Sequence, residues 1–175
     1  MDKRRLLSLD WSKANTGICV GCWGERPTLT SISFGKDDDL TRAAASVIAW
    51  FPDALKVFKP EIVVLEAAFS TGGGIATRLA FGADFFIKGC CSLAGIRMDE
   101  VHNSTWKRDI FGSANLKSED AKKKSVQIAK EFGMEPKSHD EADAFCIWLW
   151  TFLYPLKGRD EEAEQRLARL KWKLL

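Results

Sequence analysis

The chain has no apolar stretch long enough to span a bilayer. Its first residues, 1–5, are mostly charged and run directly into a short strand-like segment, so they do not form a secretory signal peptide. Internal repeats and low-complexity linkers are also missing. With 175 residues, the chain is long enough for one domain with a hydrophobic core. We therefore predict a cytoplasmic protein of a single domain.

The five cysteines show no disulfide framework. Cys90 and Cys91 are adjacent in an apolar helical segment, which indicates reduced, buried thiols. Cys19 and Cys22 form a C-x-x-C string, but no second pair and no nearby histidine accompany it. On a strand this spacing points the two side chains to opposite faces. We expect core packing rather than zinc binding or redox chemistry.

A nucleotide-binding loop of the form G-x-x-x-x-G-K-[S/T] is absent, because the glycine cluster at 72–74 is not followed by Lys-Ser or Lys-Thr. Residues 140–143 spell the helicase motif DEAD, but the chain is also too short for a helicase core. Sugar kinases and actin-like ATPases also carry an aspartate on the first strand, followed by a turn and Thr-Gly, as Asp10 is followed here by Thr16-Gly17. Those proteins need two halves, each of the size of a whole domain, and this chain has room for one.

The net charge of +2 does not indicate nucleic-acid binding by itself, but one segment is strongly basic. Its basic residues are diluted by only three acids and comprise Lys107, Arg108, Lys117, Lys122, Lys123, Lys124 and Lys130. Such a local surface can contact phosphates in a nearly neutral protein. From charge alone, a solvated helix face is an equally good interpretation.

Hydrophobic periodicity predicts an α/β fold. Strands are expected at 4–10, 18–23, 28–34, 62–66 and 96–102, and helices at 40–58, 72–94, 103–111, 118–132, 138–155 and 159–175. We expect Pro52 to interrupt or start the first helix. The order indicates a mixed five-stranded sheet of the ribonuclease-H kind, with helices on both faces. In such a sheet the first strand is central and the strand after the first helix lies beside it.

Four acids occur where these elements would bring them together. Asp10 and Glu66 each end an apolar strand, while Asp140 and Asp143 share one face near the start of an apolar helix. A buried acid is costly unless it is paired or binds a cation. Carboxylate sites prefer hard ions such as Mg²⁺ or Mn²⁺, and two such ions about 4 Å apart can hydrolyse a phosphodiester. We predict a divalent-metal site.

Other roles are possible for single acids. Glu141 stands at the third helical position after Ser138, which predicts a capping box and a structural role. Asp143 alone could pair with a buried basic residue, and Asp10 alone could cap a turn through Ser12. The joint placement of the four acids favours the metal site.

Taken in order, residues 5–152 resemble the RuvC family of Holliday-junction resolvases, and its phage-type or divergent members in particular. The segments that carry the resemblance are Leu7-Ser8-Leu9-Asp10 with Thr16-Gly17, Val63-Val64-Leu65-Glu66-Ala67-Ala68-Phe69, Arg78-Leu79-Ala80-Phe81-Gly82, Trp106-Lys107 with Gly112, and His139-Asp140-Glu141-Ala142-Asp143-Ala144. The family usually has Pro-Gly after the first aspartate, where this chain has Trp11-Ser12.

The resemblance implies a ribonuclease H-like nuclease domain at 1–155. The tail exceeds the matching region, and its apolar stripe predicts an amphipathic C-terminal helix at 156–175, an extension of the same domain that could pack on the body, extend the dimer or bind a partner. It implies a homodimeric crossover junction endodeoxyribonuclease, in the cytoplasm of a bacterium or of a phage host, that makes paired symmetric nicks in four-way DNA. Asp10, Glu66, Asp140 and Asp143 would hold two Mg²⁺ ions, for which Mn²⁺ substitutes. The helix at 75–94 would lie at the dimer interface, with a buried central helix as the alternative interpretation. A broader flap or fork nuclease and a non-catalytic DNA-binding protein are the alternatives.

The resemblance also implies DNA contacts. Lys107 matches a family lysine near the scissile phosphate and joins the catalytic residues. Lys117 falls close to a second family lysine, with Lys122 as an alternative for that role. Phe69 matches an aromatic residue that contacts unstacked bases, although a core or dimer contact is an equal alternative. The expected DNA-binding set is Phe69, Arg78, Lys107, Arg108, Lys117 and Lys122. His139 could join the site or hydrogen-bond locally.

Overall fold

The computed structural model describes residues 4–12, 14–34, 40–68 and 74–154. Five strands form one sheet: β1 (Arg5–Asp10), β2 (Thr16–Cys22), β3 (Thr28–Ile32), β4 (Ile62–Glu66) and β5 (Arg97–Val101). Their order is β3-β2-β1-β4-β5. Strands β1 to β3 form an antiparallel meander, and β4 and β5 run parallel to β1. The predicted mixed sheet with β1 at its centre is confirmed.

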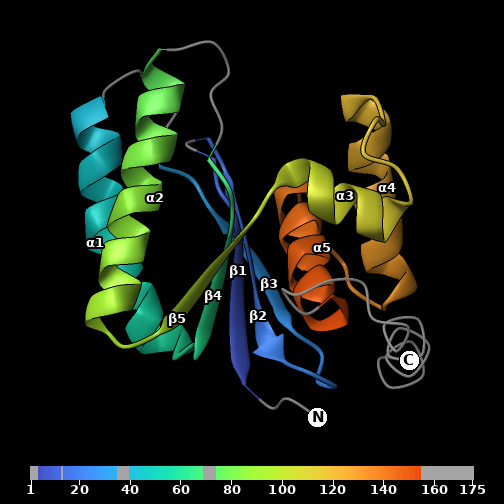
Figure 1. The fold of residues 1–175 in the computed structure, drawn as a ribbon, viewed down its shortest axis with the longest axis horizontal. Coiled ribbons are helices and arrows are strands. Elements are labelled where there is room, and N and C mark those ends of the chain that lie inside the picture. The colour runs from blue at the N-terminus through green and yellow to red at the C-terminus, as the bar shows by residue number, and fades with distance from the viewer. Residues whose placement is uncertain (1–3, 13, 35–39, 69–73, 155–175) are drawn as a thin grey trace.

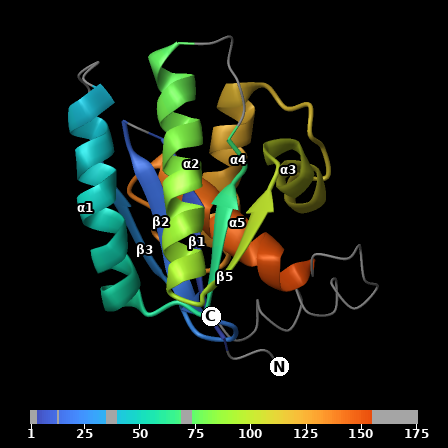
Figure 2. The ribbon, with the colours of Figure 1, turned by 60° about the vertical axis from the view of Figure 1, so that its left-hand side comes forward.

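The described helices are α1 (Leu40–Phe58), α2 (Ile75–Leu93), α3 (Asn103–Phe111), α4 (Ser118–Glu131) and α5 (His139–Leu153). Helices α1 and α2 cover one face of the sheet, while α5, with α3 and α4 beside it, covers the other (Figure 1). In Figure 2, α1 and α2 lie side by side along the sheet. Among the described residues, no helix combines the length and the apolar character that crossing a membrane requires. The helix predicted at 159–175 lies outside the described residues.

The expected interruption of the first helix at Pro52 is wrong. Helix α1 continues through Pro52. A proline inside a helix removes one backbone hydrogen bond, but Val47, Phe51 and Ala54 on the same helix are buried in the core. The burial of this apolar face holds the helix together across the proline.

Successive side chains of a β-strand point to opposite faces of the sheet, and this alternation determines which side chains of β1 face α5. Leu7 and Leu9 of β1 pack in the core that also contains Phe51 of α1 and Ile87 of α2. Leu6 of β1 packs in the opposite core, beneath α5. Because the side-chain period of a strand is two residues, the next positions on the α5 face are 8 and 10. The sheet therefore directs the last residue of β1 toward α5.

Helix α5 packs directly on the sheet through polar and steric contacts. The buried Ser8 Oγ donates a hydrogen bond to the carbonyl oxygen of Ala144, at 2.7 Å. At Gly17, the first turn of α5 approaches so closely that a Cβ atom would lie 1.9 Å from the carbonyl oxygen of Asp140. Only glycine allows this approach. The start of α5 is thus fixed against the beginning of β2.

We predict that Gly17→Ala destabilises the protein and displaces the first turn of α5. The added methyl group would have to move backbone rather than a flexible side chain, so a loss of about 1–3 kcal/mol in the free energy of unfolding is expected. Urea unfolding measures the loss. Gly89→Ala is the control, because a Cβ there meets nothing within 4 Å in the described structure and Gly89 lies in α2. Equal stability of Gly17→Ala and the wild type would contradict the close approach.

Candidate active site

The four acids converge at one edge of the sheet. Strands β1 and β4 are parallel neighbours with Leu9 opposite Leu65, so their last residues, Asp10 and Glu66, lie side by side. Asp140 and Asp143 belong to the first two turns of α5. Gly17 pairs with Asp10 across the sheet and also packs against the backbone of Asp140. This contact brings the start of α5 to the same edge. The predicted juxtaposition of these four residues is what the fold produces.

The carboxylates interact electrostatically. Burial raises the pKa of Asp10 well above its ordinary value, and the charges of Glu66, Asp143 and Asp140 raise it further. Burial likewise raises the pKa of Asp143 from 3.8 to about 6, with Glu66 and Asp140 adding to the shift. Lys107 opposes the shift at both aspartates. Among the described residues, the site therefore gathers more negative charge than Lys107 balances, and a bound cation would relieve the repulsion.

Neutral donors orient three of the acids, and sequence reasoning gave them no such role. Asn15 Nδ2 donates to Asp140 Oδ2 at 2.6 Å, and Ser125 Oγ donates to Asp143 Oδ1. Glu66 is held at both oxygens: Asn103 Nδ2 donates to Oε1 at 2.7 Å, and Trp106 Nε1 donates to Oε2 at 2.8 Å. Such partners are the usual supports of metal-binding carboxylates.

A signal for one of these donors was present in the sequence. Ser125 is fully buried on α4, and it lies between the buried Ala121 and Ala129 at four-residue spacing. A polar side chain on the apolar face of a helix needs a partner. The spacing marks Ser125 as a residue with a specific contact, although it does not say that the contact is Asp143.

The donor chemistry of the site fits a hard divalent cation, although the side chains do not form a complete cage. Among the described residues, no three or more His, Cys, Asp or Glu side chains are placed so that they could hold a metal ion. Mg²⁺ commonly keeps several waters and uses only one or two carboxylates. Each carboxylate oxygen has two lone pairs, so an oxygen that accepts a hydrogen bond can still bind a cation. Asp10 and Asp143, with their raised pKa values, are the acids that a cation would stabilise most.

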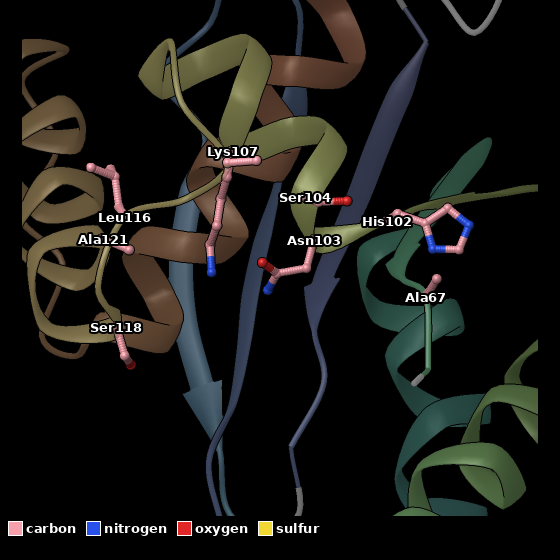
Figure 3. A pocket seen from close by; sticks show the side chains of 9 residues that line it. Ala67, His102, Asn103, Ser104, Lys107, Leu116, Ser118 and Ala121 are labelled. Atoms are coloured by element: carbon pink, nitrogen blue, oxygen red, sulfur yellow. The ribbon is translucent and has the colours of Figure 1, made fainter. Parts of the chain in front are cut away.

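A pocket of about 540 Å³ lies beside Glu66, because its lining includes Ala67, which follows Glu66, and Asn103, which donates to the Glu66 carboxylate. Its walls come from the start of α3, from residue 67 after β4, and from the loop before α4 together with the first turn of α4 (Figure 3). Lys107 and Asn103 extend from α3 into the space between these walls, and Ser118 lies opposite them. Lys107 thus lines the pocket while its charge acts on Asp10 and Asp143. The pocket can accept an anionic group next to the carboxylates.

The remaining predicted DNA contacts are dispersed. Lys117 is exposed at the start of α4, between the pocket-lining residues 116 and 118, and Lys122 is exposed one turn further on. Arg108 is exposed on α3 and pairs with Asp109 at 3.2 Å. Arg78 is exposed on α2, across the sheet from α5, where it lines a different groove. Phe69 lies outside the described residues.

Glu141 and His139 hold different places at the start of α5. Glu141 is 3% exposed and accepts hydrogen bonds from Ser31 Oγ and from the backbone N–H of Lys137. Its own N–H donates to the N-cap residue Ser138. The Ser138 half of the predicted capping box therefore forms as expected, while the reciprocal bond to the Glu141 carboxylate comes from Lys137, one residue before the N-cap, so Glu141 has structural contacts. His139 is the first residue of α5 and is exposed.

Comparison with solved structures relates this fold to known proteins, although no protein-family model and no curated protein sequence matches the chain. RuvC of Thermus thermophilus is 17% identical over 82% of this chain and 90% of its own, with a TM-score of 0.61. T. thermophilus RuvC in complex with a Holliday junction substrate is 15% identical, with a TM-score of 0.62, over 82% and 89% of the two chains. The yeast mitochondrial Holliday junction resolvase Ydc2 is 14% identical over 98% of this chain and 80% of its own, with a TM-score of 0.55.

These similarities define the class of the fold. The chain has the α/β, ribonuclease H-like architecture found in the RuvC and Ydc2 resolvases, as the sequence predicted. At such low identity the comparison concerns the fold, and the chemistry has to be argued from the residues at the site.

Without a divalent cation, the stability of the protein should fall as pH rises through the window set by Asp143. The folded carboxyl holds its proton up to about pH 6, whereas an ordinary aspartate releases it near 3.8. The folded state binds more protons in this window, so its stability is greatest below the window and declines above it. Asp143→Asn should weaken this decline and raise the metal-free stability at neutral pH by on the order of 1 kcal/mol.

Urea unfolding across the same window, with and without Mg²⁺, measures both effects. Mg²⁺ should raise the unfolding midpoint of the wild type more than that of Asp143→Asn. Asp53→Asn is the matched control, since Asp53 is exposed and pairs only with Lys56 in the described contacts. A metal-free Asp143→Asn variant that follows the wild type at every pH would contradict the raised pKa of the buried Asp143 carboxyl.

Proposed function

We propose that this protein is a Mg²⁺-dependent nuclease that resolves four-way DNA junctions by phosphodiester hydrolysis. The observation that carries the proposal is the set of four carboxylates and one lysine gathered at the edge of a resolvase-like fold. One of the structural neighbours, T. thermophilus RuvC, has a structure described as a complex with a Holliday junction substrate. An acidic site beside an anion-accepting pocket suits a substrate whose backbone is a chain of phosphates.

Each residue at the site has a proposed role. Asp10, Glu66, Asp140 and Asp143 would hold Mg²⁺, which supplies an activated water and positive charge for the leaving oxygen when it is bound. Lys107 would contact the phosphate from the pocket side. Hydrolysis adds water across one phosphorus–oxygen bond of the DNA backbone, so that one end carries the phosphate and the other a hydroxyl group.

The DNA is proposed to pass over the pocket and the start of α4. Lys117 lies between two residues that line the pocket, which favours it over Lys122 as the second active-site lysine. Lys122 and Arg108 are exposed on the neighbouring helices and are proposed as backbone contacts. The role of Phe69 at unstacked bases follows from the family resemblance alone. Because Arg78 lies across the sheet, it is a less direct candidate for a DNA contact.

A homodimer would place two such sites on one junction. Helix α2 presents Phe81 and Phe85 with 48% and 81% of their surfaces exposed. Beside them, a groove of about 190 Å³ runs between α1 and α2, lined largely by apolar side chains such as Val47 and Phe86. A two-fold interface requires one patch to complement itself. Protruding phenyl rings next to an apolar groove meet this requirement, so a second copy of the chain is the proposed occupant.

Cleavage of labelled DNA tests the proposed function. With Mg²⁺, the wild type should make paired nicks in a four-way junction and act little on linear duplex. Asp10→Asn and Asp143→Asn should bind the junction but lose cleavage by at least about 100-fold, because each loses a negative ligand at the site. Asp53→Asn, an exposed carboxylate of α1, is the control and should cleave normally.

The same assay separates the alternatives. Comparable cleavage of flaps and forks would indicate a broader branched-DNA nuclease. Junction binding without any Mg²⁺- or Mn²⁺-dependent cleavage would indicate a non-catalytic DNA-binding protein. Unimpaired Asp10→Asn and Asp143→Asn variants, or equal action on linear duplex, would overturn the resolvase proposal.

The dimer is tested by Phe85→Glu. Because Phe85 is exposed in the single chain, the charge should leave the fold intact and break the association of two copies. Sedimentation equilibrium should show a dimer for the wild type and a monomer for the variant. Lys56→Gln, on the exposed surface of α1, lowers the net charge by the same single unit and is the control. A wild type that remains monomeric at high concentration would contradict the proposal.

A further inference from the structure

We infer that Trp106 is a positioning residue that sets Glu66 and Lys107 relative to one another. The inference rests on the proposed function, because it assigns Glu66 to cation binding and Lys107 to the phosphate. Trp106 is fully buried in α3, and its indole N–H donates to Glu66 Oε2 at 2.8 Å. The ammonium nitrogen of Lys107 lies 5.1 Å from the centroid of the same indole. One rigid ring thus contacts an acid at its edge and a cation at its face.

Burial fixes the direction of the indole N–H. The ring packs edge-on against Phe111, with centroids 5.2 Å apart, within the core beneath α5. An indole nitrogen only donates hydrogen bonds, and a buried donor requires an acceptor. Glu66 Oε2 is that acceptor. Because the ring is clamped by the core, the position of this carboxylate oxygen is set by core packing.

The second oxygen of Glu66 is held independently by Asn103. Its amide donates to Oε1 at 2.7 Å, so donors on both sides oppose rotation of the carboxylate. Both donors come from α3, one at its first residue and the other one turn later. Two oxygens offer about four lone-pair sites, and these two hydrogen bonds leave the others available to a cation.

The ring face gives Lys107 a place without using its N–H donors. A lysine ammonium is attracted to the negative face of an indole through charge rather than through hydrogen bonds. The three N–H groups therefore stay available to an anion in the pocket that Lys107 lines. A direct ion pair between Lys107 and Glu66 would instead neutralise the carboxylate. The indole therefore holds the Glu66 carboxylate and the Lys107 ammonium in one site, with Glu66 left to bind a cation and Lys107 left to bind a phosphate.

Titration of Mn²⁺ into the DNA-free protein tests the inference. Trp106→Phe keeps an aromatic ring in the core but removes the N–H, so the affinity for Mn²⁺ should fall by about 10- to 100-fold, as is typical for lost supports of a metal ligand. Trp148→Phe is the matched control. Trp148 is also fully buried, and its N–H donates to the backbone carbonyl of Gly21 at 3.4 Å rather than to an acid. This control should bind Mn²⁺ like the wild type.

Two further variants distinguish positioning from a general loss of structure. If Trp106 acts through Glu66, Trp106→Phe should cause no additional loss of Mn²⁺ affinity in a Glu66→Gln background. Asn103→Ala should lower the affinity in the same way, and it leaves the core intact should Trp106→Phe fold poorly. Wild-type affinity in both Trp106→Phe and Asn103→Ala, or an equal loss with and without Glu66, would overturn the inference. Because no DNA is present, these results do not depend on whether junctions are cleaved.

Discussion

The burial of carboxylates beside one another at the end of β1 is the constraint on which the account of this structure depends. Burial and neighbouring charges raise the pKa of Asp10 and Asp143, so the site is costly to keep ionised without a cation. The fold holds the acids there nonetheless, through the central position of β1 and the close packing of α5 at Gly17. Burying carboxylates together in this way lowers the free energy of unfolding, and such local destabilisation is typical of a functional site.

The surroundings of the acids consist mainly of neutral donors. Asn15 and Ser125 donate to the two aspartates of α5, and α3 supplies two donors to Glu66. Neutral donors orient a carboxylate without cancelling its charge, which keeps it available to a metal ion. Lys107 of α3, whose charge acts on Asp10 and Asp143, also lines the neighbouring pocket. Helix α3 therefore contributes both to the acidic site and to the surface proposed for the phosphate.

The positions of the acids could be predicted from sequence because they depend on local periodicity. Two apolar strands end in Asp10 and Glu66, and a three-residue spacing on a helix aligns Asp140 with Asp143. The donors could not be predicted in the same way, since Ser125 and Asp143 belong to different helices and meet only through tertiary packing. The continuation of α1 through Pro52 was missed for a related reason: burial of one face outweighed the local effect of proline.

Proton release on metal binding tests the central claim most directly. If the repelled carboxyls bind the cation, then Mn²⁺ must displace their protons at a pH near 6, the value to which the pKa of Asp143 is raised. Calorimetric titration in two buffers of different ionisation enthalpy measures this number of protons. We predict net release near that pH and a decline toward zero well above it. Binding of Mn²⁺ without proton release at any pH would contradict the account.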